Sequence, residues 1–195
     1  MTTFMKTAAL GVSLMASVAF ADLATAADYK VDAEGAGMHA AINFRANHLG
    51  YSFVTGRFDK FTGTFNWDKS DPAASKFVID INAGSVNTNH AKRDEHLRSA
   101  DFFDVANHPT AKFESTSIEK TGDKTGIIKG NLTIRGVTKE VAIQANYIGE
   151  GDDPWGGYRA GFSGTATITP ADFGMPHGVA KAPLQLMLEV EGVRQ

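Results

Sequence analysis

The sequence predicts an all-β domain whose strands pair antiparallel around one buried face. Apolar and polar residues alternate with a period of two through most of the chain, for example in residues 61–68, and successive side chains on a strand point to opposite faces. The alternating runs are short and are separated by turn residues such as Thr-Gly-Asp at 121–123. Only one segment, residues 87–104, departs clearly from this pattern.

About nine strand-like runs follow one another along the chain, each with one apolar and one polar face. Because the runs are short and joined by turns, neighbouring runs are expected to pair antiparallel. In chain order they cover residues 38–45, 51–58, 61–68, 77–81, 111–113, 128–134, 141–147, 158–168 and 184–190.

The segment 87–104 is expected to form a short helix on the connection between two strands. Thr88 or Asn89 is the candidate N-cap. Asp94 and Arg98 form an acid-before-base pair four residues apart, which supports a helix. The segment has few apolar residues, so most of its surface is expected to face water.

A sheet with one apolar face must cover that face with a second sheet or close into a barrel. The chain has 13 Phe and 20 Gly, and aromatic walls on strongly bent strands need both residue types. This composition favours a curved barrel. The periodicity alone fits an immunoglobulin-like sandwich with a solid core equally well, so both architectures stay open at this point.

The first 26 residues have the features of a secretory signal peptide. Lys6 supplies the positive charge, residues 8–20 form an apolar stretch, and Ala-Thr-Ala at 24–26 is a cleavage site. Cleavage after Ala21 is a second option, and an ordinary N-terminal core helix is the alternative, although the segment lacks a polar face. The folded domain is therefore expected to span residues 27–195 and to be exported to the periplasm.

Composition excludes several classes of protein. The formal net charge is −3, which argues against a nucleic-acid binder that works by phosphate neutralisation. No apolar run approaches the roughly 18 residues that a membrane-spanning helix needs, so no integral helical segment is expected. The chain has no cysteine, which excludes disulfides and cysteine metal ligands.

Ordered motifs are spread over the expected domain. They are NFR at 43–45, HLGY at 48–51, GRF at 56–58, FTGTF at 61–65, SVNTNH at 85–90, DFFD at 101–104, GNLT at 130–133, GVTK at 136–139, GDDPWGG at 151–157 and RAGF at 159–162. In these motifs the chain resembles the YceI-like family of secreted lipocalin-like proteins. The resemblance implies an extended antiparallel β-barrel around a tunnel for a long isoprenoid or other amphiphilic lipid, in the periplasm, without a metal or redox cofactor. The chain departs most from the family at residues 175–183, near the last strand.

An apolar tunnel is sufficient to hold such a chain, because each methylene removed from water contributes about 0.8 kcal/mol. The inward faces of the alternating runs supply the candidate walls: Ile42, Phe44, Phe53, Phe61, Phe65, Phe77, Ile79, Phe113, Leu132, Val141, Ile143, Phe162, Leu186 and Leu188. The same side chains fit a core in which they pack against one another. Periodicity identifies the inward face and does not distinguish a cavity from a filled interior.

A ligand with a polar head group needs hydrogen-bond donors at the mouth of the tunnel. Candidate donors are Asn87, His90, Arg93, Arg98 and Arg159. Phe102 and Phe103 are candidates to close the entrance and to tie the helix to the sheet. In the alternative interpretation, Arg93 and Asp94 make surface or capping ion pairs that only dock the helix.

The sequence contains no recognisable catalytic set or metal motif. The six histidines, at 39, 48, 90, 96, 108 and 177, include no H-E-x-x-H pattern and no pair four residues apart. A nucleophile elbow, a P-loop and a dinucleotide fingerprint are also missing. The expected function is therefore a non-enzymatic carrier that sequesters an isoprenoid-like lipid, such as a quinone or its precursor, with no catalytic residue, metal or cofactor.

Two other functions stay open. The first is an enzyme that acts on an amphiphilic substrate inside the barrel, although no catalytic set supports it. The second is an outer-membrane barrel, which is opposed by the short strand runs, the lack of an outward aromatic girdle and the non-aromatic C-terminus at 193–195. A homodimer is compatible with a barrel that has exposed edges, and the sequence leaves the oligomeric state open.

Overall fold

The computed structural model describes residues 26–33 and 38–195. The predicted signal peptide therefore lies almost wholly outside the described residues. Within the described part, eleven strands, one α-helix and four 3₁₀ turns follow in this order: β1 Ala27–Val31, β2 Ala41–His48, β3 Ser52–Phe58, β4 Phe61–Trp67, η1 Pro72–Ala74, β5 Lys76–Asn82, η2 Ala83–Ser85, β6 Val86–Asn87, α1 Ala91–Arg98, β7 Thr110–Lys120, β8 Thr125–Ile134, β9 Val137–Asp152, β10 Tyr158–Ile168, η3 Pro170–Phe173, η4 Gly178–Lys181 and β11 Leu184–Arg194.

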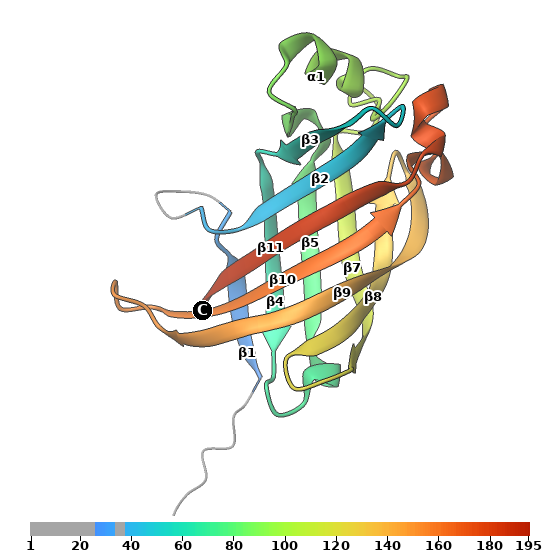
Figure 1. The fold of residues 1–195 in the computed structure, drawn as a ribbon. Coiled ribbons are helices and arrows are strands. Elements are labelled where there is room, and N and C mark those ends of the chain that lie inside the picture. Colours follow the sequence, from blue (N-terminus) through green and yellow to red (C-terminus); the bar gives the residue numbers. More distant parts are fainter. Residues whose placement is uncertain (1–25, 34–37) are drawn as a thin grey trace, which may run out of the picture.

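Eight of these strands close into an antiparallel barrel (Figure 1). The order around the barrel is β1, β4, β5, β7, β8, β9, β10 and β11, and β11 returns to β1. At this closing seam Tyr29 lies opposite Arg194 and Lys30 opposite Val193. The predicted antiparallel barrel of about eight strands is confirmed. The sandwich alternative does not hold, because the sheet closes on itself.

Strands β2, β3 and β6 extend the barrel wall at the end that carries α1 (Figure 1). The first half of β11, from Leu184 to Glu189, pairs with β2, whereas residues 192–194 pair with β1. Strand β3 continues the wall from β2 and pairs with β6 through Arg57 and Phe58. The sequence analysis did not identify β1 or β6. The signal for β1 was present, because Ala27, Tyr29 and Val31 alternate with Asp28 and Lys30, whereas the two residues of β6 are too few to show an alternation.

Helix α1 lies within the predicted segment 87–104, but its first turn is arranged differently from the prediction. The N-cap is His90, whose Nδ1 accepts a hydrogen bond from the Arg93 backbone N–H at 3.2 Å. Thr88 instead donates its backbone N–H to Asp94 Oδ1 at 2.8 Å, and Asp94 is buried. The predicted Asp94 to Arg98 pair is therefore wrong, since Asp94 points back to the chain before the helix.

Two glycines give aromatic rings space inside the barrel. Gly56 lies opposite Phe44 in the β2–β3 pair, and a Cβ at Gly56 would stand 2.3 Å from Phe44 Cζ. A Cβ at Gly130 would likewise stand 2.5 Å from the Phe113 ring. The two aromatic side chains thus lie flat over backbone that has no side chain, which lets large inward residues fit on a curved wall.

Candidate functional site

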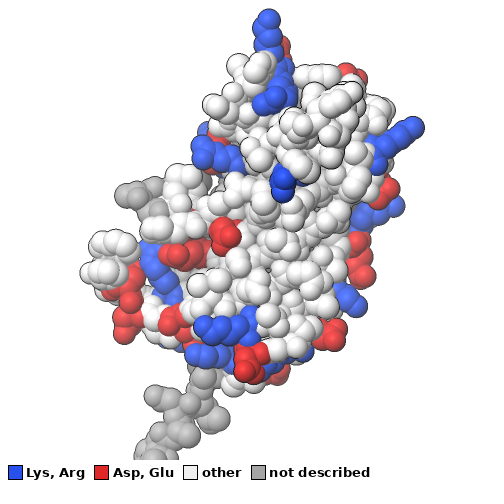
Figure 2. All heavy atoms as spheres, viewed as in Figure 1, with Lys and Arg blue, Asp and Glu red and all other residues white. Residues whose placement is uncertain are grey.

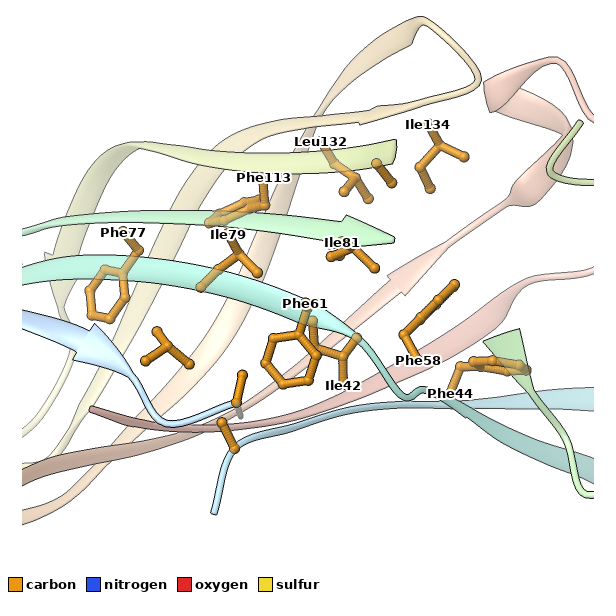
Figure 3. Packing of buried hydrophobic residues seen from close by; sticks show 14 of the residues in the cluster. Ile42, Phe44, Phe58, Phe61, Phe77, Ile79, Ile81, Phe113, Leu132 and Ile134 are labelled. Atoms are coloured by element: carbon orange, nitrogen blue, oxygen red, sulfur yellow. The ribbon is translucent and has the colours of Figure 1, made fainter. Parts of the chain in front are cut away.

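The barrel encloses a cavity of about 420 Å³ on the side of α1. Side chains from β2 to β5 and from β7 to β11 form its walls. Figure 3 shows many of these side chains, among them Ile42, Ile79 and Leu132, extending from different strands into one shared interior. The walls are almost entirely aliphatic and aromatic, so the cavity favours an apolar occupant over water.

Most of the predicted wall residues line this cavity. They are Ile42, Phe44, Phe61, Phe77, Ile79, Phe113, Leu132, Val141, Ile143, Phe162, Leu186 and Leu188. Inward neighbours that the sequence analysis did not name also contribute, including Ala46, Val54, Phe58, Ile81 and Ile128. The sequence already indicated these residues. Each lies on the inward face, because it is an even number of positions along its strand from another inward-facing residue.

Two predicted wall residues lie elsewhere. Phe53 is exposed on the outside of β3, where the Arg45 guanidinium carbon lies 3.6 Å from its ring centroid. Phe53 and Phe58 are five positions apart, an odd number, and Phe58 is the buried one, so Phe53 must face outward. Phe65 is buried but lies beyond the cavity, stacked between Tyr29 at 4.8 Å and Phe77 at 5.2 Å.

The mouth of the cavity is formed by α1 with the turn after it, the tip of the β2–β3 hairpin, and η4. Three rings meet there: His177 stacks on Phe102 with centroids 4.9 Å apart, and His96 meets both rings edge-on. Phe103 packs edge-on against Phe58 at 5.5 Å and so ties the helical segment to the sheet, whereas the ring partners of Phe102 are His96 and His177.

The predicted mouth residues separate into two groups. Arg93, Phe102 and Phe103 line the cavity. Arg93 is held by hydrogen bonds from its Nε to Thr88 Oγ1 at 2.7 Å and from its Nη2 to the Thr88 carbonyl at 2.8 Å. The remaining candidates are not part of the lining; Asn87 donates to Asp59, and His90 caps the helix.

Arg98 also lies outside the lining, on the last turn of α1, where its carbonyl accepts the Val105 N–H at 3.0 Å. The mouth instead contains His48, His96 and His177, together with Leu49, Leu97 and Val179. The histidines at 48 and 177 were assigned to no site in the sequence analysis, because no local pattern shows that the hairpin tip and the segment before β11 meet.

Arg159 lies at the opposite end of the barrel, which corrects its predicted place at the mouth. Its guanidinium hydrogen-bonds to Asp32, Asp153 and Glu191, each at 2.7 Å. The bond from Arg159, followed by backbone N–H donors, lowers the pKa of Asp153. Burial alone would raise the pKa of Asp32, but the hydrogen bonds from Arg159 and His39 outweigh it and lower that pKa.

Asp32, His39 and Glu191 bring three potential metal-ligand atoms within 4.8 Å of one another. This group does not suit a cation, because the Arg159 guanidinium already bonds to both carboxylates and supplies the compensating positive charge. The cluster instead links β10 and β11 to the chain after β1, near the closing seam of the barrel.

A second cavity of about 380 Å³ lies at the end of the barrel away from α1. It shares Phe77, Ile128, Ala145 and Phe162 with the first cavity, so these side chains lie between the two spaces. Its rim is polar, with Lys69, Lys120, Lys124 and Glu150. Burial, with the Glu150 carboxylate as the next cause, raises the pKa of Tyr147, whose hydroxyl faces no hydrogen-bond partner among the described residues.

The closed barrel and its apolar interior define the class of lipocalin-like barrels that enclose a cavity. The YceI-like domain model matches residues 29–191, and the chain belongs to this family. In residues 26–33 and 38–195, no helix is both long and apolar enough to span a membrane.

Known proteins with similar sequences and structures support this assignment. A UPF0312 protein of Pseudomonas aeruginosa is 52% identical over 193 residues, covering 98% of this chain and all of that protein. The YCEI protein of Campylobacter jejuni has 30% identity and a TM-score of 0.68 over 76% of this chain and 90% of its own. A polyisoprenoid binding domain from Saccharophagus degradans shares the fold, with a TM-score of 0.63 and 15% identity over 88% of this chain and 100% of that domain.

Proposed function

We propose that this protein is a periplasmic carrier that holds a long-chain isoprenoid or a similar amphiphilic lipid, such as a quinone or its precursor, inside the barrel. The observation that carries the proposal is the apolar cavity of about 420 Å³, which opens at one end between α1, the β2–β3 hairpin and η4. The polyisoprenoid binding domain with the same fold gives additional support for this class of ligand.

The energetics of the cavity favour a hydrocarbon chain. Ten methylenes transferred from water would contribute on the order of 8 kcal/mol before ordering costs are subtracted. This is enough for a carrier that uses no catalytic group. The export signal predicted in the first 26 residues fits a protein that moves lipid through an aqueous compartment outside the cytoplasm.

The mouth provides the polar contacts that a head group needs. Arg93, His48, His96 and His177 are the polar side chains of the lining with ring or guanidinium N–H groups, and Phe102 offers an aromatic face beside them. We therefore place the apolar chain along β5, β7 and β8 and the head group beneath α1. This orientation leaves the head group within reach of solvent and the chain fully enclosed.

The test is to express the full chain with export to the periplasm, purify it, and analyse an organic extract by mass spectrometry. Val54→Phe fills the cavity from β3, whereas Thr55→Phe adds the same ring on the exposed outer face of the same strand. We expect a long-chain lipid in the wild type and in Thr55→Phe and its loss in Val54→Phe. Absence of lipid in the wild type, together with no uptake of isoprenoids by the delipidated protein, would overturn the proposal. A chemically altered lipid would favour the enzyme alternative.

A further inference from the structure

Large apolar side chains gather around the mouth of the cavity and point into solvent. Leu49, Tyr51 and Phe53 at the tip of the β2–β3 hairpin are 68%, 86% and 51% exposed, and Val179 on η4 is 48% exposed. These are four of the seven large hydrophobic residues that are exposed in the described part of the chain. Figure 1 shows the hairpin tip and the segment before β11 at the same end of the barrel as α1. Exposed apolar residues that gather in this way mark an interaction surface.

The turn between β2 and β3 places Leu49 in an unfavourable backbone conformation. The His48 carbonyl accepts the Tyr51 N–H at 3.0 Å, and the two central residues, Leu49 and Gly50, have φ of 56° and 83°. Turns of this kind prefer Asn or Asp before Gly, because a leucine in the left-handed region meets steric strain. Leu49 also leaves its side chain in water. Neither property stabilises the monomer, so the leucine is better explained by a contact outside the barrel.

The two segments that carry this apolar surface bear only positive charges. The hairpin segment 41–58 and the segment 174–183 contain Arg45, Arg57 and Lys181 and no acidic residue, although the whole chain has a net charge of −3. Arg57 pairs with Asp59 at 2.6 Å, whereas Arg45 and Lys181 have no ion-pair partner among the residues described. In the view of Figure 2 most acidic atoms lie away from this end. The surface thus combines apolar tips with uncompensated cations.

The neighbouring helix does not reverse this pattern. The acidic side chains of α1 and the following turn are partly engaged: Asp94 accepts from Thr88, Asp101 lies 3.0 Å from His96, and Asp104 bonds to Asn107. Glu95 on α1 and Asp172 on η3 are exposed, and α1 also carries Lys92 and Arg98. The helix therefore adds charges of both signs beside the hairpin and η4. The hairpin segment and segment 174–183 themselves carry only positive charges.

We propose that the hairpin tip and η4 form a docking surface for an anionic lipid bilayer. Leu49, Phe53 and Val179 would enter the interfacial layer, Tyr51 would lie at the level of the head groups, and Arg45 and Lys181 would face lipid phosphates. A second copy of the chain fits less well, because a narrow hairpin tip is convex and cannot supply the roughly 1,000 Å² that a stable protein interface buries.

This docking mode gives the mouth a direct path to the membrane. Leu49 and Val179 both line the cavity and are exposed, so they connect the interior to the outer surface. A lipid could then pass between the bilayer and the barrel without exposing its chain to water. This consequence rests on the proposed carrier function, but the docking itself does not and can be measured without any cargo.

The experiment measures binding of the exported, processed protein to vesicles of phosphatidylglycerol and phosphatidylcholine in equal parts, by flotation. Intact mass first verifies that the signal peptide has been removed. Leu49→Asn introduces the residue that this turn prefers, so the fold should be kept. We expect it to weaken vesicle binding about tenfold, because one leucine is no longer partly buried in the bilayer. Arg45→Gln and Lys181→Gln should each weaken binding about fivefold, and only when the anionic lipid is present.

Ile148→Ser and Trp155→Ser serve as matched controls, because both residues are exposed hydrophobics outside the mouth. They should leave vesicle binding unchanged. The proposal is overturned if the wild type does not bind these vesicles, if the control variants weaken binding as much as Leu49→Asn does, or if Leu49→Asn instead dissociates a dimer seen by size exclusion. Vesicle binding without lipid in the purified protein would retain the docking surface and reject the carrier function.

Discussion

Phe162 packs edge-on against Phe77 with ring centroids 5.3 Å apart, and both rings line the two cavities of the barrel. The pair therefore forms part of the inner end of the first cavity, on the side away from α1, and limits how deep a bound chain can reach. Phe65 and Trp67 support Phe162 from the other side, with centroid distances of 5.5 and 4.8 Å. The depth of the site is thus set by aromatic packing in the middle of the barrel.

Opening this inner end should lengthen the preferred ligand. In Phe162→Ala the two cavities are expected to merge, so that longer isoprenoid chains bind, at a cost of about 3 to 5 kcal/mol of stability. The measurement is competition between isoprenoid alcohols of increasing length for the delipidated protein. Phe65→Ala is the matched control, because Phe65 is buried but lines neither cavity. An identical change of chain-length preference in both variants would show that loosened packing is responsible.

Phe102 should matter more for loading than for stability. Its ring is half-buried at the mouth and stacks on His177, so Phe102→Ala opens the entrance while most of the core stays packed. We expect a several-fold loss of lipid retention with a small decrease in melting temperature, about 1 kcal/mol or less of stability. The melting temperature and the extracted lipid are measured on the same preparation. Proportional losses in both would instead support a structural role for the ring.

The inward faces of the strands were predictable because side-chain direction on a strand follows directly from spacing. Ile42, Phe44 and Phe61 were placed correctly on this basis. The same rule, applied through Phe58, would have placed Phe53 outside. Periodicity could not reveal the cavity itself, because an empty interior and a filled one have the same alternation of apolar residues.

The end of the barrel at which a residue lies was harder to predict. Arg159 stands at the start of β10, whereas the mouth lies where β10 ends and β11 begins, at Ile168 and Leu184. Antiparallel pairing would have indicated this once the strand bounds were known. The contacts of His177 with Phe102 have no local signal, because η4 and the segment after α1 are far apart in sequence and meet only when the barrel closes.

A side chain at Gly56 should distort the cavity wall. A Cβ there would overlap the Phe44 ring, so Gly56→Ala forces Phe44 to move and is expected to lower stability by about 1 to 3 kcal/mol. Lipid retention should fall as well, because Phe44 lines the cavity. Gly178→Ala is the control, since nothing lies within 4 Å of its added Cβ. Chemical denaturation gives the stability of both variants, and equal values would contradict the tight contact at Gly56.

The cluster around Arg159 should make the stability of the barrel depend on pH in the acid range. The folded protein holds the pKa values of Asp32 and Asp153 below the ordinary 3.8. A carboxyl whose pKa is lower in the folded state contributes stability at pH values above its unfolded pKa and loses it as the pH falls through its folded pKa. The melting temperature of the wild type should therefore fall as the pH decreases below about 4.

In Arg159→Gln, Asp32 loses the arginine that lowers its pKa most. Burial then dominates, so the pKa of Asp32 should rise. That variant should be destabilised most at neutral pH and should differ least from the wild type in acid.

Lys112→Gln is the control. It removes an exposed ion pair with Glu114 at 2.9 Å and should leave the pH profile nearly unchanged. Melting curves of the three proteins between neutral pH and about pH 3 test this, and parallel profiles for the wild type and Arg159→Gln would show that the cluster does not couple the closing seam to protonation.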